Sequence, residues 1–279
     1  MSNNEISKEE VDQYDRQIRL WGIEAQNRLR NANVLIIGMG GFGAEVTKNI
    51  VLAGINSIVL MDDKNVTMVD GSCQFLIDIT KDIGRNRAEC SVSRTKLLNP
   101  NVKVSFIAET IKNLSNDYLK KFDVICATTG SQEDITRLDE TCRENGTVLF
   151  FGCVQGTFAY YFIDAGSHEY TKKTIKNQET TYSEDVQEFP KFSDVLETRN
   201  PSTLLIKALD FITGVKKPIL MEFGVACAVI GGIVAQEIIK AISKKDPLYN
   251  NFFVFDSQGD GSGQFYKVLK EKYPCQKFD

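Results

Sequence analysis

The sequence predicts an α/β fold: a doubly wound, Rossmann-like and mostly parallel sheet with antiparallel edge strands and an N-terminal helical arm. Continuous apolar runs, among them "NVLIIG" and "SIVLMDD", alternate with helical segments, as expected of strands buried on both faces. A glycine-rich turn lies between the first of these runs and the helix that follows it. Later segments alternate and are rich in aromatic residues, which favours antiparallel strands.

The N-terminal arm, residues 1–30, is predicted to be helical from about Ser7 onward. Ser7 is a suitable N-cap, and acidic residues follow it in the first turn. A break near Trp21–Gly22 is expected to divide the arm into two pieces. The arm contains "QYDRQIRLWG", which carries two arginines and the single tryptophan of the chain.

The remaining elements follow a βαβ rhythm. The predicted parallel strands are 33–38, 57–63, 103–109, 122–128 and 147–154, and the helices between them are 44–54, 84–100 and 132–146. Antiparallel strands are predicted at 157–166, 250–258 and 263–270. We expect residues 1–279 to form a single domain with an exposed, inserted excursion at about 167–218. A helical segment, "QEFPKFSDVLETRNPSTLLIKALDFITG", closes that excursion.

Composition narrows the function classes. The chain has 33 basic and 37 acidic residues, a net charge of −4, which argues against nucleic acid as a partner. Its longest apolar segment, "GVACAVIGGIVAQEIIKAI", is interrupted by Gln236 and Glu237 and is predicted to be a buried helix, so no membrane partner is expected. None of the seven cysteines forms a C-x-x-C pair, so no metal site is predicted from them.

The segment "IIGMGGFGAE" carries the first chemical signal. Gly38, Gly40, Gly41 and Gly43 lie between a strand and a helix, with G-x-G-x-x-G spacing among three of them. Such glycines permit a tight turn and let backbone N–H groups approach a phosphate at the helix N-terminus. Asp62 ends the next strand, where a carboxylate accepts hydrogen bonds from ribose hydroxyls. The alternative is that the glycines serve only close packing of the helix on the strand.

Taken alone, this motif is most typical of NAD-dependent oxidoreductases. The chain, however, offers no evident proton-transfer residue for such a reaction. Its single histidine, His168, lies in the polar excursion and is expected to be a solvated loop residue. No separate substrate domain is evident either, so an oxidoreductase remains an alternative that nicotinamide binding would distinguish.

Several motifs, taken in order, resemble a known family. "YDRQIRLWGIEAQNRLRNANVLIIGMGGFGAEVTKNIVLAGI", "IGRNRAE" and "CAVIGGIVAQEIIKAISKKDPLYNNFFVFD" are similar to the ubiquitin-like-protein activating enzymes of the ThiF/MoeB-like adenylation fold. More narrowly, they resemble the smaller, non-catalytic subunit of SUMO-activating enzymes. The resemblance implies a dimer of two related adenylation folds. An active half binds ATP and Mg²⁺, adenylates the modifier's C-terminal glycine and passes it to a cysteine as a thioester.

The family's active-half pattern, "DxDxxxxSNLxRQ" followed by a lysine in "GxxK" and a later aspartate, is degraded in this chain. Asp62 matches the ribose-binding acid. The other positions carry Lys64, Asp70, Cys73, Arg87 and Thr129. Adenylation needs cations around the triphosphate and a carboxylate for magnesium, and Cys73 and Thr129 supply neither. The predicted nucleotide-binding set is therefore Gly38, Gly40, Gly41, Gly43, Asp62 and Arg87, in vestigial form, although Arg87 can still hold a phosphate.

In this family the N-terminal arm reaches across the dimer, and the resemblance assigns Arg16 of "YDRQ" to the partner's ATP site. A permanently charged, forked donor suits the neutralisation of a triphosphate. Arg19, three positions on, lies on the same helical face and is a second candidate or an ordinary salt-bridged residue. The inserted excursion contains no cysteine, so no thioester carrier is predicted.

The leading hypothesis is a regulatory subunit whose larger, catalytic partner binds ATP and Mg²⁺. SUMO-type modifier and conjugating enzyme are expected to interact through the complex. The resemblance implies the nucleus as location, with the cytoplasm second. The alternatives are a self-sufficient homodimeric adenylyltransferase of the sulfur-carrier-activating type and a nucleotide-binding scaffold that only stabilises its partner.

Overall fold

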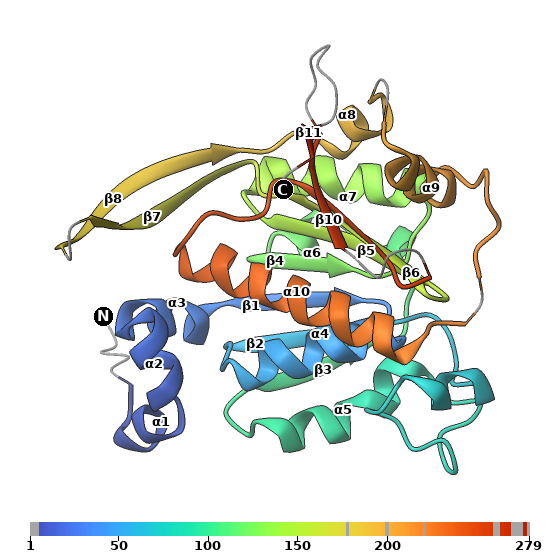
Figure 1. Cartoon of the computed structure of the whole chain (residues 1–279). Coiled ribbons are helices and arrows are strands. Elements are labelled where there is room, and N and C mark those ends of the chain that lie inside the picture. The colour runs from blue at the N-terminus through green and yellow to red at the C-terminus, as the bar shows by residue number, and fades with distance from the viewer. Residues whose placement is uncertain are drawn as a thin grey trace.

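A computed structural model describes residues 6–176, 179–198, 201–219, 221–258, 263–268 and 276–277 (Figure 1). The helices are α1 Lys8–Gln13, α2 Asp15–Trp21, α3 Ile23–Asn31, α4 Gly41–Leu52, α5 Arg87–Leu98, α6 Asn116–Leu119, α7 Gln132–Asn145, α8 Phe192–Leu196, α9 Thr203–Ile212 and α10 Gly224–Ser243. Two short 3₁₀ helices are η1 Met68–Ser72 and η2 Ile111–Asn113. The strands are β1 Asn33–Ile37, β2 Ser57–Met61, β3 Lys103–Ile107, β4 Val124–Ala127, β5 Val148–Gln155, β6 Phe158–Asp164, β7 Ser167–Lys176, β8 Glu179–Glu188, β9 Phe252–Asp256, β10 Gly263–Lys267 and β11 Gln276–Lys277.

Nine of these strands form one sheet in the order β11-β10-β9-β6-β5-β4-β1-β2-β3. The five strands from β5 to β3 are parallel, and β6, β9, β10 and β11 are antiparallel to their neighbours. The predicted doubly wound α/β fold with an antiparallel edge is thus confirmed. Parallel strands place their carboxyl ends at one edge, which is where ligands bind in such sheets.

The sheet separates two hydrophobic cores. Val34 and Ile36 of β1 face a core that includes α4 and α10, whereas Leu35 and Ile37 face the core of α7, α8 and α9. This arrangement explains why the strand sequences are continuously apolar: successive side chains enter opposite layers, and both layers are dry. Figure 1 shows α10 and α4 lying side by side across one face of the sheet.

Helix α10 is the one helix in the described part of the chain that is long and apolar enough to cross a membrane. Within this fold it packs against α4, α3 and β6. Its buried side includes Ala226, Ile230 and Ile238, which lie in the first core. About half of its residues are buried, and three, Val225, Ala228 and Gln236, are exposed.

The N-terminal arm has three helices rather than the two predicted. The Ser7 cap is confirmed: its hydroxyl accepts a hydrogen bond from the Glu10 N–H, and the Glu10 carboxylate accepts one from the Ser7 N–H. The predicted break is present at Gly22, where φ is +88°. A second break occurs at Tyr14, because its buried ring packs against Gly54, and its hydroxyl accepts a hydrogen bond from Asn99 at 2.8 Å.

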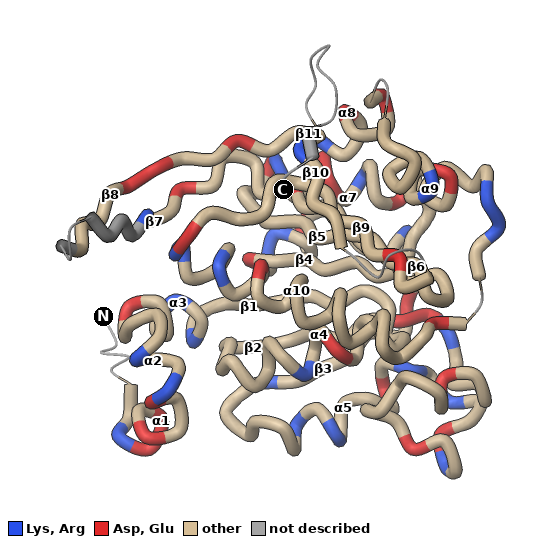
Figure 2. Tube along the Cα trace, viewed as in Figure 1, with Lys and Arg blue, Asp and Glu red and all other residues tan. Residues whose placement is uncertain are grey.

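The inserted excursion is more ordered than its polar composition indicated. It contains the long antiparallel hairpin of β7 and β8, which projects from the body in Figure 1, followed by α8 and α9. Residues 177–178 and 199–200 lie outside the described residues. The two closing helices confirm the predicted helical segment. Figure 2 shows the acidic stretch along β8, to which exposed Glu184 and Asp185 belong.

The prediction that His168 is a solvated loop residue is wrong. His168 lies on β7, is 5% exposed and stacks on Tyr170 with ring centroids 5.9 Å apart. Alternate residues of a strand share a face, so His168 and Tyr170 both point inward while their neighbours face water. Burial, with a smaller contribution from the charge of Lys244, lowers the pKa of His168 to about 4.

Candidate functional site

The glycine loop occupies the carboxyl edge of the parallel sheet, as predicted. It runs from the end of β1 at Ile37 to the start of α4 at Gly41. Gly38 has φ of +93°, a conformation that L side chains rarely adopt. A Cβ atom on Gly43 would lie 2.0 Å from the carbonyl oxygen of Gly38, so only glycine permits this close approach. The local geometry is therefore the tight strand-to-helix turn that the glycine spacing predicts.

Beside this loop lies a cavity of about 960 Å³. Its lining includes four of the predicted nucleotide-binding residues, Gly38, Gly40, Asp62 and Arg87. Gly41 and Gly43 belong to the first turn of α4 at the same place. The structure thus gathers the predicted set at one site; whether nucleotide binds there stays a prediction.

The acidic residues of this site are already paired within the chain. Asp62 accepts hydrogen bonds from the backbone N–H of Met39 at 2.7 Å and of Lys64 at 2.9 Å. Burial raises its pKa, and these bonds together with the nearby Arg87 oppose that rise. Arg87 itself lies 3.0 Å from Asp70 and 3.7 Å from Asp62. Its charge is therefore largely compensated by carboxylates, which weakens it as a phosphate anchor.

Glu222, which no sequence motif singles out, closes the glycine loop. Its Oε2 atom accepts a hydrogen bond from the Gly41 N–H at 2.5 Å, and the N–H of Phe42 also donates to this side chain. A Cβ atom on Gly40 would lie 2.5 Å from the same oxygen. The carboxylate therefore caps the N-terminus of α4, the position that favours an anion in any helix.

The residues present do not fit a triphosphate at this loop. A phosphate would compete with Glu222 for the N–H groups of Gly41 and Phe42 and would lie beside its negative charge. Thr129, at the position that the resemblance assigns to a metal-binding aspartate, lines the cavity without adding charge. Burial raises the pKa of Glu222, and the donated N–H groups and Arg87 oppose the rise. The loop thus keeps the family shape while an internal carboxylate takes the anion's place.

The inserted excursion contains no cysteine. The cysteines that the structure describes elsewhere are buried or partly buried, so none is an exposed candidate for a thioester carrier. Burial raises the pKa of Cys126 to about 12 and of Cys153 to about 11. Cys275 lies outside the described residues. The exception to this pattern is Cys73, whose pKa is lowered, first by a hydrogen bond with Cys227.

Arg16 lies at the other end of α4. Its neighbour Gln17 donates a hydrogen bond to the carbonyl of Leu52, the last residue of α4, at 3.3 Å. The 12 residues of α4 span about 18 Å at 1.5 Å per residue, so Arg16 is too far away to touch its own glycine loop. Arg16 is exposed, and among the described residues no ion pair or hydrogen bond of its side chain is found. Arg19, in contrast, pairs with Asp15 at 3.0 Å.

The sequence did not predict a role for Glu222, because nothing in its spacing links it to the glycine loop. The available signal was its isolation: it is the single charged residue of "PILMEFGVACAVIGG", directly before the apolar helix. A lone acid in an apolar segment needs hydrogen-bond partners when buried. Which partners it finds depends on α10 returning to lie beside α4.

Comparisons with known proteins agree with this geometry. The model of the ThiF family matches residues 14–276. SUMO-activating enzyme subunit 1 of Homo sapiens is 34% identical, with 92% of this chain and 95% of the relative covered. The protein of the same name from Danio rerio is 32% identical, with 94% and 96% covered.

Solved structures show the same fold at lower identity. Escherichia coli MccB, in its crystal structure with ATP, has a TM-score of 0.66 and 18% identity, covering 92% of this chain and 71% of that chain. PaaA has a TM-score of 0.68 and 18% identity, covering 96% and 77%. The chain belongs to the ThiF family and is similar over nearly its whole length to SUMO-activating enzyme subunit 1.

Proposed function

We propose that this protein is the regulatory, non-catalytic half of a heterodimeric SUMO-activating enzyme. In this assignment the larger subunit binds ATP and Mg²⁺, adenylates the modifier and carries the thioester cysteine. This chain supplies Arg16 to the partner's triphosphate. The similarity to SUMO-activating enzyme subunit 1 along almost the entire chain supports the choice of modifier system.

One observation carries the assignment: the two functional features lie at opposite ends of α4 and cannot serve one site. The glycine loop holds Glu222 where a phosphate would bind, and the exposed Arg16 lies at the other end of α4, a helix about 18 Å long. An arginine that reaches no site of its own chain is well placed to complete a site on another chain. Its forked, permanently charged donors stabilise charge that develops on a transferring phosphoryl group.

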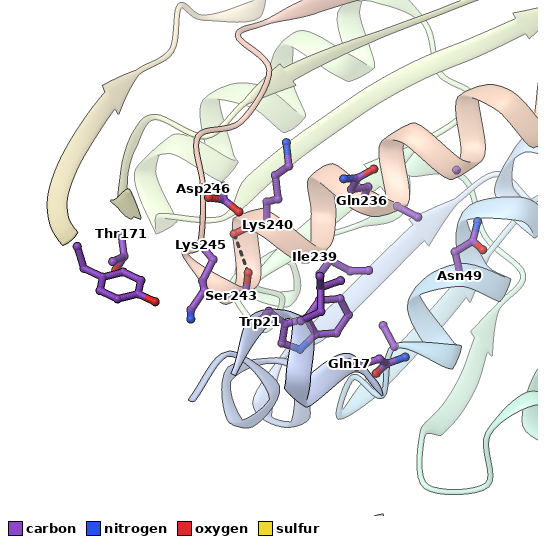
Figure 3. Close-up of a pocket in the computed structure, with 15 residues that line it drawn as sticks. Gln17, Trp21, Asn49, Thr171, Gln236, Ile239, Lys240, Ser243, Lys245 and Asp246 are labelled. Atoms are coloured by element: carbon purple, nitrogen blue, oxygen red, sulfur yellow. Dashed lines mark hydrogen bonds between the residues drawn. The ribbon is translucent and has the colours of Figure 1, made fainter. Parts of the chain in front are cut away.

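A groove next to the arm is a second observation in favour of a large protein partner. Its cavity of about 530 Å³ lies between α2, α4, α10 and the β7–β8 hairpin. Figure 3 shows Trp21, Ile239 and Gln236 facing this space, with Lys240 and Lys245 at its rim. The apolar side of α10 and Leu20, which is 81% exposed, continue the surface. An apolar centre with a polar rim is typical of a stable subunit interface.

The remaining partners follow from the complex. We propose that SUMO-type modifier and conjugating enzyme interact chiefly through the larger subunit, since this chain's own loop is closed by Glu222. We also propose the nucleus as the principal location, with the cytoplasm second; imaging of the tagged full chain tests this directly.

The deciding experiment is ATP–pyrophosphate exchange with SUMO, using this chain alone and mixed with a candidate larger subunit. We expect exchange only in the mixture, and at least a tenfold loss, about 1.4 kcal/mol of transition-state stabilisation, for Arg16→Ala. Arg19→Ala tests the second candidate on the same helix, and we expect little loss because Arg19 already pairs with Asp15. Co-elution of both variants with the partner must remain normal.

Other outcomes favour the alternatives. Exchange by the chain alone would make it a self-sufficient adenylyltransferase and overturn the regulatory assignment. A mixture that is equally active with Arg16→Ala would reduce the chain to a scaffold. Binding of a nicotinamide cofactor to the chain alone would favour an oxidoreductase.

A further inference from the structure

Two cysteines that are distant in sequence meet at the glycine loop. Cys73 follows the η1 turn, and Cys227 lies in the first turn of α10. Their sulfur atoms and a carboxylate oxygen of Glu222 lie within 4.8 Å of one another. A Cβ atom on Gly41 would be 2.6 Å from the Cys73 sulfur and 3.0 Å from the Cys227 sulfur. The two thiols therefore share the space above the first turn of α4.

The two thiols differ in their surroundings. Cys73 is partly exposed and lines the cavity of about 960 Å³, so a small oxidant can reach it. Its pKa is lowered, mainly by the hydrogen bond with Cys227, while burial and the negative charge of Glu222 oppose that shift. The Cys73 thiol also donates a hydrogen bond to Oε2 of Glu222 at 3.8 Å. Cys227 is fully buried, and the same hydrogen bond and burial raise its pKa. An accessible, acidified thiol beside a buried second thiol is the arrangement of redox-sensing cysteine pairs.

The other described thiols lack this combination. Burial raises the pKa of Cys90 to about 11, and raises that of Cys142 as well. Cys153 lines the same cavity, but burial raises its pKa to about 11. Cys153 is therefore an internal reference for a thiol that has access to the cavity without activation.

We propose that Cys73 and Cys227 form a reversible disulfide when the protein meets a hydroperoxide. The bond would tie the segment after β2 to the first turn of α10, on either side of the glycine loop. Glu222 lies directly before α10, so the bond would also hold its carboxylate in place on the Gly41 N–H. The site is independent of the proposed role of Arg16, which lies at the opposite end of α4.

The chemistry balances in two steps. The Cys73 thiolate attacks the terminal oxygen of the hydroperoxide, the O–O bond breaks, and the departing oxygen takes a proton, which leaves an alcohol or water and Cys73 sulfenic acid. The Cys227 sulfur then attacks the Cys73 sulfur, forming the S–S bond and breaking the S–O bond. The thiol proton of Cys227 leaves with the hydroxide as water. Two thiols are oxidised and one hydroperoxide is reduced.

A metal ion is the competing occupant of the same three residues. Thiolates and a carboxylate are ligands that zinc accepts. However, the N-terminus of α4 points its positive end at this place, and Arg87 lies near Glu222. These positive charges disfavour a divalent cation. The carboxylate is also already engaged by the Gly41 N–H. The observations thus favour the disulfide.

The test is a thiol count on the full chain, alone and in its complex. The protein is treated with hydrogen peroxide, quenched, denatured and alkylated with N-ethylmaleimide, and its intact mass is measured. The chain has seven cysteines. We expect seven adducts before oxidation, five after it and seven again after dithiothreitol. Peptide mapping should join the peptide that contains Cys73 to the one that contains Cys227.

Three variants keep the test decisive. Cys227→Ser should leave Cys73 as a sulfenic acid that dimedone traps, whereas wild type should give little dimedone adduct. Cys73→Ser should resist oxidation at the same peroxide concentration. Cys153→Ser should form the bridge like wild type. Equal melting temperatures of the reduced proteins establish that the variants fold.

The proposal is overturned if all seven thiols remain alkylatable, or if the bridge maps to another pair. It is also overturned if the purified chain holds stoichiometric zinc that Cys73→Ser releases.

Discussion

The two ends of helix α4 differ in whether the charged side chain beside them is bonded within the chain or exposed to solvent. At its N-terminus, the glycine loop that looks built for a phosphate is occupied by Glu222, whose carboxylate is hydrogen-bonded to Gly41. At its C-terminus, the arm presents Arg16 to solvent, about 18 Å away along the helix. A glycine loop with the expected spacing is therefore not by itself an open phosphate site. The backbone N–H groups of the loop that already donate hydrogen bonds to Glu222 cannot also donate them to a ligand.

We expect the largest effect from a substitution in the groove beside the arm. Gly232 lies in the middle of α10 and lines the groove, and a Cβ atom there would meet nothing within 4 Å. Gly232→Arg should therefore leave the fold intact but place a long charged side chain in the proposed interface. We expect association with the larger subunit to weaken at least 100-fold, about 2.7 kcal/mol, measured by calorimetry.

A control for this change is Glu144→Arg, which places the same arginine side chain at an exposed position on α7, outside the groove. It should bind like wild type. Normal binding by Gly232→Arg would show that the partner docks elsewhere.

The next effect concerns the form of the cation at the open end. Arg16→Lys keeps the positive charge but removes the forked donor geometry. In ATP–pyrophosphate exchange by the complex, its rate should fall between those of wild type and Arg16→Ala. A lysine variant that matches wild type would mean that charge alone matters and that Arg16 works by long-range attraction, which added salt should then weaken.

Asp139 is a second buried acid whose pKa, like that of Glu222, is raised by burial. Asp139 is 2% exposed; burial, followed by the charge of Asp164, raises its pKa to about 8. Arg143 binds Asp164, and Asp139 accepts a hydrogen bond from the Phe192 N–H at 2.8 Å. The folded chain therefore keeps a proton here that the unfolded chain loses near pH 4.

Because folding raises the pKa of Asp139, its contribution to stability is complete below about pH 4 and is lost as pH rises through 8. Over that window the contribution of Asp139 to the free energy of unfolding should fall by on the order of 1 kcal/mol per pH unit. Asp139→Asn should remove this part of the pH dependence in denaturant titrations at pH 6 and pH 9. An unchanged difference between the two pH values would show that Asp139 is ionised in the folded chain.

We expect the smallest effect from removing the carboxylate of Glu222 at the glycine loop. Glu222→Ala frees the N–H groups of Gly41 and Phe42 and removes a negative charge from the glycine loop. The isolated variant should gain weak binding of pyrophosphate, with a Kd on the order of 1 mM, where wild type shows none by calorimetry. It should also lose about 1 kcal/mol of stability through the missing helix cap. Equal affinity of wild type and variant would mean that Glu222 does not exclude phosphate.

Much of the fold was present in the sequence. Continuous apolar strands such as "NVLIIG", the Ser7 cap and the glycine spacing depend on neighbours along the chain, so local patterns predict them. The second break in the arm was not predictable, because it depends on Tyr14 packing against Gly54. The burial of His168 depends likewise on which face of the β7–β8 hairpin turns toward the body.

Local sequence patterns specify the α/β architecture and the position of the glycine loop, and they place the uncharged residues Cys73 and Thr129 at its cavity. Only the tertiary structure decided that Glu222 fills the loop, that Cys73 and Cys227 meet beside it, and that Arg16 lies beyond its reach. The reason is physical: a backbone turn is a local property, whereas the occupant of that turn arrives from α10, which lies far away along the chain and next to α4 in space.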